Sequence, residues 1–480
     1  MTRTFILASI LLGLSPSPAL ARTFYMSNAG NDNAMGTSSG PWATLNKANA
    51  TMTSGDTLYI RGGVYSGVSG VRWSKSGTVN SPVVISAYPG EHPLFNGNGA
   101  NAFMNTSSQY TIIDGLEITN YTLWAVEVGT TSSYVTLRNC YLHNILAAEN
   151  ASIVTSQCDH VTIENCVFEE MGRSLTQTKF DHAVYNSGGS HDITIRNNYF
   201  KNNYGGPAIN NYHTPAPYNV SIYNNVFLMT KGTERSGVYA GTFGQNISLY
   251  NNTFYADGAG ATTVYGINLG AGAGTDVAEN NIFYFINSNI QNALVGASGN
   301  TVDYNLYYPA RDPDDTGAHS LSGDPLFNSP GSDFHLTALS PARNNAVTIS
   351  MFSTDADGIP RPAGAWDMGA YQYRVGTTAD AGAGDAEVGD GGGDAIGAVE
   401  VPAGADGAVT PEASGRAIST PDVDLPGNPP VEAGGYAQPT QRTPASGGCS
   451  CTSIPSGGAP SPVLVAAMAL PLGACRRRRR

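Results

Sequence analysis

One short stretch of the sequence gathers side chains that could move a proton or hold an anion. Lys179, Asp181, His182 and Tyr185 lie close together there, and Arg235 follows further along the chain. Eliminative cleavage beside a uronate needs a base near the C5 proton and a positive group or cation at the carboxylate. Lys179, His182, Tyr185 and Arg235 are therefore candidate catalytic residues.

Further polar and aromatic residues follow the same stretch and are candidates for substrate binding: Asp181, Asn210, Tyr212, His213, Glu234 and Tyr239. A glycoside hydrolase would need two carboxylates about 5–9 Å apart, and the pair Asp181 and Glu234 is a weaker match to that spacing. A structural alternative stays open, in which the tyrosines form a solvent-facing ladder and His182 caps a turn.

A second candidate site is an acidic loop. Asp312, Asp314 and Asp315 place three carboxylates within four residues, and carboxylate oxygens are the donors that Ca²⁺ prefers. The loop predicts Ca²⁺ as a possible cofactor, with a solvated acidic loop as the alternative.

The elements that position these residues are set by a repeated phrase. Asn139, Asn165, Asn197, Asn224, Asn251 and Asn280 mark its copies, at steps of 26, 32, 27, 27 and 29 residues. Each copy opens on an alternating β-branched strand pattern and breaks at Asn-Asn or Asn-Cys, where Asn tolerates left-handed backbone angles. Units of this length are too short for propeller blades. The fold class predicted is all-β: a single-stranded right-handed parallel β-helix with an N-terminal capping helix.

Successive coils would stack like residues on one another. Two inward aliphatic rows are predicted, Leu137, Ile163, Ile195, Ile222 and Leu249 in one, and Val184, Ile209, Val238 and Ile267 in the other. Asn198, Asn225, Asn252 and Asn281 would form a ladder of side-chain amides. The outward row is Glu127, Val154, Tyr185, Asn210, Tyr239 and Asn268, so the ~4.8 Å strand spacing would bring the candidate residues together.

Two cysteines, Cys140 and Cys166, share a phase of the repeat and would be neighbours. They could form a disulfide in an exported chain. We favour two buried thiols that behave as small apolar residues.

The ends of the repeat carry their own marks. Pro41–Met52 has the pattern of an amphipathic helix with Trp42, Leu45, Ala48 and Met52 on one face. The stretch from Phe24 through Gly67 resembles the start of secreted pectate-lyase-like β-helix proteins, a family that implies polysaccharide lyases, epimerases or hydrolases. Gly323–Phe327, Asp357–Pro362 and Asp367–Tyr371 resemble the closing segment of bacterial choice-of-anchor surface proteins.

Composition divides the chain into four parts. Residues 1–21 have the pattern of a signal peptide that ends at Ala21, and residues 22–375 would form the β-helix. Residues 376–447 are rich in Gly, Ala, Pro and Asp and predict a disordered acidic linker. Residues 448–480 hold Cys449 and Cys451, a short apolar run and five final arginines.

That tail resembles the myxobacterial-type C-terminal sorting signal. The resemblance implies processing or lipid attachment at Cys449 or Cys451, and an outer-membrane anchor at the cell surface. An ordinary tail anchor with its arginines inside the cell is the alternative.

The charge pattern argues against a nucleic-acid partner. The whole chain has a formal charge of −13, and residues 22–375 carry 16 Lys and Arg against 26 Asp and Glu. A chain with no basic domain does not fit a polyanionic nucleic acid. We expect an exported monomer that acts on or binds polysaccharide, as a lyase-like enzyme of acidic glycans. The alternative is a non-catalytic, adhesin-like surface protein that binds glycans or serves as a rigid rod.

Overall fold

A computed structural model of the chain describes residues 20–147, 150–172, 180–204, 206–231, 234–241, 246–257, 263–269, 275–286, 292–296 and 298–375. Most of the predicted signal peptide, the linker and the tail lie outside these ranges. Within them, no helix combines the length and the apolar character that a membrane crossing requires.

Three parallel sheets make up the fold, and each is named here by its first strand in the sequence. The β1 sheet contains β1 (Thr23–Met26), β2 (Thr57–Ile60), β5 (Val83–Ala87), β8 (Gln109–Asp114), β11 (Ser133–Arg138), β14 (Thr162–Glu164), β17 (His191–Arg196), β20 (Tyr218–Tyr223), β23 (Ile247–Tyr250), β26 (Val277–Glu279) and β29 (Thr301–Asp303). The β3 sheet contains β3 (Gly63–Ser66), β6 (Pro93–Asn96), β9 (Glu117–Thr119), β12 (Tyr141–His143), β15 (Val167–Glu169), β18 (Tyr199–Lys201), β21 (Val226–Leu228), β24 (Thr253–Asp257), β27 (Ile282–Ile286), β30 (Leu306–Tyr308) and β31 (Leu321–Ser322). The β4 sheet contains β4 (Val71–Trp73), β7 (Ala102–Thr106), β10 (Trp124–Val128), β13 (Ala151–Ser156), β16 (His182–Ser187), β19 (Pro207–Asn211), β22 (Glu234–Tyr239), β25 (Thr263–Asn268) and β28 (Asn292–Val295).

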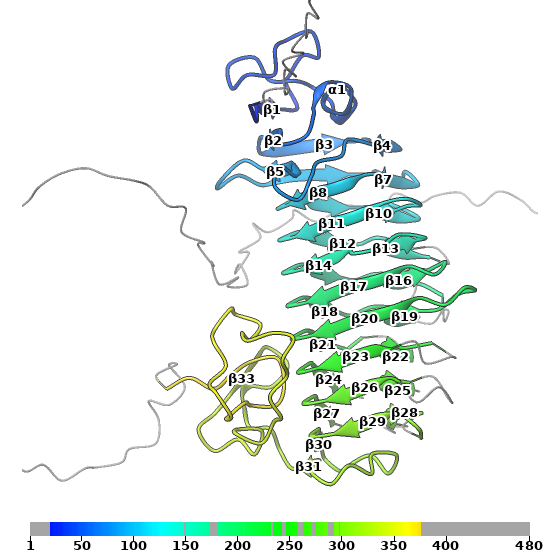
Figure 1. The fold of residues 1–480 in the computed structure, drawn as a ribbon, viewed down its shortest axis with the longest axis vertical. Helices are drawn as coiled ribbons and strands as arrows, with labels where there is room; N and C mark the ends of the chain where they lie inside the picture. The colour runs from blue at the N-terminus through cyan, green and yellow to red at the C-terminus, as the bar shows by residue number, and fades with distance from the viewer. Residues whose placement is uncertain are drawn as a thin grey trace, which may run out of the picture. The chain divides into compact units, whose positions relative to one another are not determined.

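The chain visits the three sheets in turn, and each coil stacks on the coil before it (Figure 1). The predicted right-handed parallel β-helix is confirmed. Its inward rows pair as the repeat predicts: Ile163 lies beside Leu137 and Ile195, and Ile209 lies beside Val184 and Val238. Both rows are buried, so the aliphatic core runs along the inside of the coils.

A second core row is aromatic. Phe168, Phe200, Phe227 and Phe254 stack face to face, with ring centroids 4.8, 4.8 and 4.5 Å apart. Small residues of the β4 sheet face these rings. A Cβ atom at Gly237 would lie 2.5 Å from a ring carbon of Phe254, so the large and small rows fill the interior together.

The asparagine corner joins the β1 sheet to the β3 sheet. The six Asn residues that mark the repeat all have positive φ, between 51° and 63°. This is the left-handed conformation that Asn adopts more readily than most residues. The sharp turn follows directly from the repeated Asn.

The residue after each corner forms the predicted amide ladder. Asn198 Nδ2 donates to Asn225 Oδ1 at 3.0 Å, and Asn225 Nδ2 donates in the same way to Asn252. Asn252 and Asn281 continue the ladder to Asn305, one step beyond the predicted run. Each ladder Oδ1 also accepts a backbone N–H of the preceding coil, as Asn198 does from Cys166. The ladder therefore satisfies buried main-chain donors as well as its own amides.

Cys140 and Cys166 extend the same row toward the N-terminus. Both are buried unpaired thiols, as we favoured. Each sulfur lies 3.3 Å from a main-chain carbonyl oxygen, that of Arg138 for Cys140 and that of Glu164 for Cys166. Burial raises the pKa of Cys166 well above its usual value, so this thiol is inert at neutral pH.

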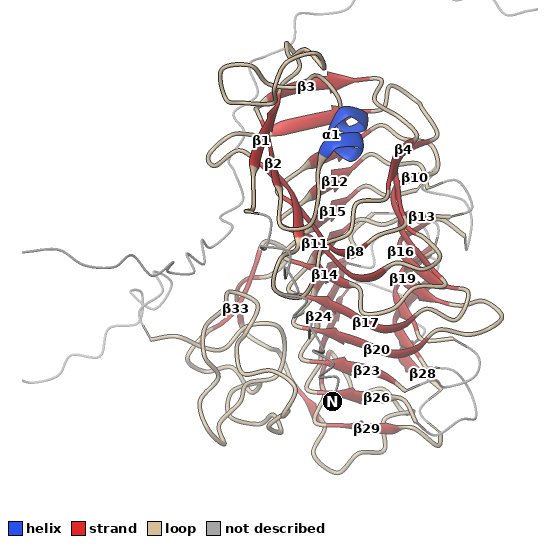
Figure 2. Cartoon of the chain, turned by 45° about the horizontal axis from the view of Figure 1, so that its top comes forward, coloured by secondary structure: helices blue, strands red, loops and turns tan. Residues whose placement is uncertain are grey.

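The N-terminal end of the stack is covered by the single helix of the described ranges (Figure 2). The helix α1 spans Leu45–Thr51 and is shorter than predicted, because the Thr44 side chain accepts the Lys47 N–H as its N-cap. Trp42 lies before the helix and makes a bridge to Met26 in β1. The predicted apolar face is confirmed, since Trp42, Leu45, Ala48 and Met52 are all buried.

Residues 323–375 pack on the outer face of the β3 sheet, with β32 (Phe327–Ser329) and β33 (Asp333–Leu336) as a short antiparallel pair. The outer face of the β3 sheet is polar at Glu117, His143 and Lys201 but apolar further along. A second apolar cluster joins the two parts: Val226, Leu228, Tyr255, Ile282, Tyr284, Leu306, Phe327, Phe334, Leu336, Ala342, Met368 and Ala370. The change from polar to apolar outward residues thus marks where this closing segment binds.

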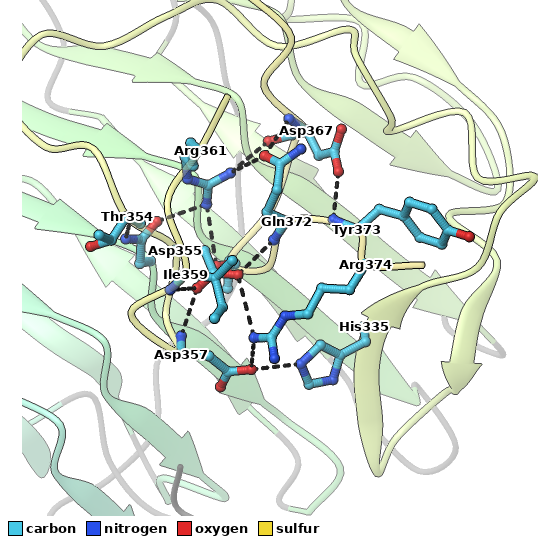
Figure 3. A network of polar contacts seen from close by, with 12 residues as sticks. His335, Thr354, Asp355, Asp357, Ile359, Arg361, Asp367, Gln372, Tyr373 and Arg374 are labelled. Atoms are coloured by element: carbon cyan, nitrogen blue, oxygen red, sulfur yellow. Dashed lines mark hydrogen bonds and ion pairs between the residues drawn. The ribbon is translucent and has the colours of Figure 1, made fainter. Parts of the chain in front are cut away.

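A buried guanidinium organises the closing segment (Figure 3). Arg361 is 6% exposed and donates to the carbonyl oxygens of Asp367, Gly369 and Ala370. It also donates to Asn224 Oδ1 at 3.0 Å, which ties the segment to the asparagine corner. Burial lowers the pKa of Arg361 to about 10, against the effect of the nearby Asp355 and Asp367. The Arg361 cluster holds the segment in place through main-chain acceptors rather than through a surface ion pair.

A pH-dependent contact lies at the edge of the same segment. His335 Nδ1 meets Asp333 at 2.6 Å and Nε2 meets Asp357 at 2.9 Å, and Arg374 pairs with Asp357. Burial by itself lowers the pKa of His335, but the hydrogen bonds to Asp333 and Asp357 outweigh it and raise the pKa to about 9 from 6.5. The folded state therefore binds this proton more tightly than the unfolded state does.

His335 should stabilise the fold fully below pH 6.5 and lose that contribution as the pH rises through about 9. We expect the difference in melting temperature between the wild type and His335→Gln to be largest at pH 6 and to shrink by pH 9.5. Differential scanning fluorimetry across this range measures it. A difference that stays constant with pH would contradict the assignment.

Candidate functional site

The candidate row lies on the outer face of the β4 sheet. Strand register places Tyr185 beside Val154 on one side and Asn210 on the other, and Asn210 in turn beside Tyr239. The order along the sheet is Glu127, Val154, Tyr185, Asn210, Tyr239 and Asn268, as the repeat predicts. Neighbours in this row are about 4.8 Å apart.

Tyrosine rings line this face. Tyr185 and Tyr239 are partly exposed, and Tyr212, just after β19, is 50% exposed. The rings of Tyr212 and Tyr239 lie 6.1 Å apart and are tilted by 51°. Burial raises the pKa of Tyr185, with a further rise from Tyr212, so this phenol is protonated at neutral pH. The face offers neutral aromatic surfaces with hydroxyl groups, which suit the apolar side of a sugar ring.

His182 is held by hydrogen bonds on both sides. It is 2% exposed, its Nδ1 lies 2.8 Å from the Pro207 carbonyl oxygen, and its Nε2 lies 2.9 Å from Asn210 Nδ2. Burial lowers the pKa of His182 to about 4, against the raising effects of Pro207 and Asp181. An imidazole that is neutral and engaged at both nitrogens suits positioning of its neighbours better than proton transfer.

The close fit around His182 depends on Gly206. A Cβ atom at this position would lie 2.9 Å from Cε1 of the imidazole. Asp181 is fully buried, and its main-chain carbonyl accepts from Asn203 Nδ2 at 3.1 Å. The pair Asp181 and His182 is therefore part of the packed base of the site.

The other candidate residues are only partly placed. His213 is exposed, and its Nδ1 donates to the Thr214 carbonyl oxygen at 3.1 Å. Glu234 and Arg235 belong to β22, where their main chains pair with Thr263 and Val264; their side chains are outside the described part of the structure. Lys179 also lies outside the described residues. The structure thus brings together His182, Tyr185, Asn210, Tyr212 and Tyr239.

Sequence reasoning missed two polar residues that continue the row. Arg72 pairs in register with Asn105, and Asn105 pairs with Glu127. Asn105 Nδ2 also donates to the Glu127 carboxylate. The repeated phrase is degenerate before Ile112. The repeat therefore could not show which residues of β4 and β7 belong to the row. Extending the strand register by one coil at a time would have found both residues.

In the acidic loop predicted to bind calcium, the Asp312 carboxylate accepts main-chain N–H groups. Asp312 Oδ2 accepts the Leu294 N–H of β28 at 3.0 Å, and Asp312 Oδ1 accepts the Asp314 N–H. Burial raises the pKa of Asp312. Asp314 is exposed. The Asp312 carboxylate therefore accepts a main-chain N–H of β28, the edge strand of the β4 sheet in the described part of the chain, which has no further strand as its acceptor.

Asp315 accepts hydrogen bonds at the end of the amide ladder. Its Oδ2 accepts from Tyr307 Oη and Ser320 Oγ, both at 2.7 Å, and lies 3.4 Å from Asn305 Nδ2. Its Oδ1 pairs with Arg311 at 3.0 Å. Among the described residues, no group of three His, Cys, Asp or Glu side chains is arranged to hold a metal ion. Asp312 and Asp315 thus accept hydrogen bonds at the last coils, and calcium binding by Asp312, Asp314 and Asp315 stays a prediction.

The predicted cleavage point lies at the opposite end. Ala21 is exposed, and the main-chain N–H of Arg22 donates to the buried Asp56 carboxylate at 2.9 Å. Cys449 and Cys451 lie outside the described residues.

Comparisons with known proteins agree with this architecture. Residues 24–171 match a family described as "Pel9A-like, right handed beta helix region", and residues 124–306 match "Right handed beta helix region". Both descriptions agree with the right-handed β-helix that the structure shows. Pectate lyase PEL9 of Emericella nidulans is 40% identical over 78 residues, which are 16% of this chain and 19% of that protein. This chain thus matches less than a fifth of that relative's length.

Solved structures that are similar to this chain are so at low identity. Pectate lyase Pel9A is 14% identical, with 74% of this chain and 96% of that chain covered and a TM-score of 0.43. An alginate lyase from a Paenibacillus species is 15% identical, with 63% and 98% covered and a TM-score of 0.43. PfbA, a surface adhesin of Streptococcus pneumoniae, is 15% identical, with 55% and 73% covered and a TM-score of 0.38. Similarity at this level says nothing of the activity of this chain.

Replacing Asp315 should test its capping role. Asp315→Ala leaves Arg311, Tyr307 and Ser320 without their shared acceptor, and we expect a loss of about 3 kcal/mol in the free energy of unfolding. Asp314→Ala, the exposed neighbour, should change it by less than about 0.5 kcal/mol. EDTA and added Ca²⁺ should leave the wild-type melting temperature unchanged. A rise in melting temperature with Ca²⁺ that Asp315→Ala abolishes would overturn the capping assignment.

Proposed function

We propose that this protein acts on an acidic polysaccharide as a lyase-like enzyme, through the outer face of the β4 sheet. The observation that carries the proposal is the 40% identity over 78 residues to a pectate lyase. The match of residues 24–171 to the Pel9A-like region agrees with it. The row of Tyr185, Asn210 and Tyr239 supplies the polar and aromatic surface that a polysaccharide would contact.

The proposed reaction is a β-elimination beside a uronate. A base removes the C5 proton, the electrons of that bond form a C4–C5 double bond, and the C4–O bond breaks with a proton passing to the leaving oxygen. Lys179 is proposed as the base and Arg235 as the group that pairs with the carboxylate. Tyr185, a phenol whose pKa burial raises, is proposed as the donor to the leaving oxygen. His182 is hydrogen-bonded to Asn210, which lies beside Tyr185 in register.

A second function, non-catalytic glycan binding, is favoured by one feature of the site. His182, the one imidazole in the packed base of the candidate row, has both nitrogens engaged in hydrogen bonds and cannot accept a proton without breaking one of them. A face built of neutral tyrosines and an amide can hold a sugar without transforming it. Both functions use the same surface, so they are distinguished by product formation.

We expect the full-length protein to release unsaturated products, detected by their ultraviolet absorbance, from polygalacturonate, rhamnogalacturonan or alginate. Tyr185→Phe should then lower kcat/KM by about 10²-fold or more, since a positioned acid contributes at least that much. Tyr134→Phe, at an exposed ring in β11, outside the β4 sheet, is the control and should not change it. Binding of any of these polymers without product would favour the second function; neither binding nor product would overturn both.

Export and surface display are proposed from the ends of the chain. The signal-like residues 1–21 and the tail that follows the linker, residues 448–480, would be removed or modified, which leaves the β-helix outside the outer membrane on its linker. Mass spectrometry of the protein purified from its own cells should find a chain that begins at Arg22 and lacks Arg480. A mature protein that keeps Arg480 would contradict processing of the tail.

A further inference from the structure

An exposed arginine begins the outward row of the β4 sheet. Arg72 lies in β4, and its neighbours Val71 and Trp73 are buried, so the alternation of the strand directs Arg72 to the outer face. Strand register leads from Arg72 through Asn105, Glu127 and Val154 to Tyr185. Arg72 and Tyr185 are therefore four strand steps apart on one face, which is about 19 Å.

The Arg72 guanidinium has no acceptor in the described part of the chain. The other arginines whose side chains are described are bound: Arg22, Arg61, Arg138, Arg196, Arg311 and Arg374 pair with carboxylates, and Arg343 and Arg361 donate to main-chain carbonyl oxygens. A guanidinium carries five N–H donors and stays charged at every ordinary pH. These donors are available to a ligand at Arg72.

The nearest carboxylate of the row does not neutralise Arg72. Glu127 lies two strand steps away, at about 10 Å, with Asn105 between them. The Asn105 amide donates to the Glu127 carboxylate, so Glu127 is bound by a neutral neighbour and makes no ion pair with Arg72. The positive charge at the start of the row is therefore uncompensated within that row.

Two lysines add to the positive charge at this end of the stack. Asn49 Oδ1 accepts the Ser74 N–H at 2.9 Å, which brings α1 beside the residues that follow β4. Lys47 in α1 and Lys75 after Ser74 make no side-chain hydrogen bond or ion pair with another described residue. The end of the row is thus locally positive in a domain that is acidic overall.

The chemistry of an exposed guanidinium selects a carboxylate. Its planar fork of N–H donors matches the two oxygens of a carboxylate. A polyuronate is repelled by the net negative charge of residues 22–375, so it needs local cations to hold it. No groove is needed for access, because Arg72 is exposed and the closing segment packs on the β3 sheet, away from the β4 strands (Figure 1).

We propose that Arg72 binds a carboxylate of the acidic polysaccharide at a subsite remote from the reacting bond. The proposal rests on the polysaccharide function above and deepens it. The polymer would lie along the stack on the outer face of the β4 sheet, with the reacting bond near Tyr185 and a further uronate at Arg72. The substrate class becomes a polymer whose uronates extend well beyond the bond that is cleaved. Arg72 is a binding residue, since about 19 Å separates it from Tyr185.

The test compares polygalacturonate with its methyl ester, which has the same backbone and no carboxylate charge. Binding is measured calorimetrically at pH 7 and low salt with the full-length Tyr185→Phe protein as the reference, so that cleavage does not consume the probe. Adding Arg72→Gln should weaken binding of polygalacturonate about fivefold, the effect of one well-aligned exposed ion pair. Binding of the methyl ester should not change. Arg72→Lys keeps the charge without the planar fork and should bind between the two.

The matched control is Arg138→Gln in the same reference protein. Arg138 lies on the outer face of the β1 sheet with a side chain 39% exposed, and its replacement removes the same charge. This variant should bind polygalacturonate as the reference does. High salt screens exposed charges, so the difference between the reference and Arg72→Gln should shrink there. Melting temperatures show which variants are folded.

Kinetics separates binding at Arg72 from a part in the chemical step. An interaction that is equally strong in the ground state and the transition state changes KM and leaves kcat unchanged. Arg72→Gln, with Tyr185 retained, should therefore raise KM for polygalacturonate about fivefold at constant kcat. A fall in kcat with KM unchanged would contradict a remote binding role.

The outcomes separate this proposal from the one it rests on. If neither the wild type nor the reference protein binds polygalacturonate, both are overturned. If polygalacturonate binds but Arg72→Gln leaves its affinity unchanged, weakens both polymers equally or does no more than Arg138→Gln, the subsite is overturned and the polysaccharide function stands. If Arg72→Gln weakens polygalacturonate alone while the wild type releases no product, the subsite stands and the lyase activity is overturned.

Discussion

Each coil of this β-helix satisfies its main-chain hydrogen bonds through the coil before it and the coil after it. Buried N–H and C=O groups cannot be left unpaired without a large cost, so the register of every strand is fixed by its neighbour. The asparagine ladder extends the same rule to the corner, where Asn225 accepts both the main-chain N–H and the side-chain amide of Asn198. A constraint on the backbone thereby fixes which side chains meet on each outer face.

The same constraint makes the two ends of the stack energetically unfavourable, because the N–H and C=O groups of an edge strand have no neighbouring coil to pair with. At the start, α1 and Trp42 cover the first coil with apolar side chains. At the other end, Asp312 takes up an edge N–H and Asp315 ends the amide ladder. The closing segment then covers the apolar part of the β3 sheet and is bound to it through Arg361. Two of the acidic residues predicted to bind a cation, Asp312 and Asp315, are in the fold also acceptors for donors at the end of the stack.

The proposed function uses a face that these demands do not occupy. The β4 sheet carries Tyr185, Asn210 and Tyr239 outward, and no part of the closing segment is needed to place them. The base of this face is rigid because His182 is packed against Gly206 and bonded on both sides.

The sequence by itself determined the repeat, the inward rows, the amide ladder and the outward order of the candidate residues. It could do so because one period governs every coil, and like positions must stack. It did not determine what Asp312, Asp315 and His182 do. The partners of His182 are a main-chain carbonyl and an amide from the next coil, at Pro207 and Asn210, and main-chain atoms leave no trace in residue types. Edges and caps exist only once the coils are stacked, so the tertiary structure alone shows that Asp312 and Asp315 accept hydrogen bonds from the last coils.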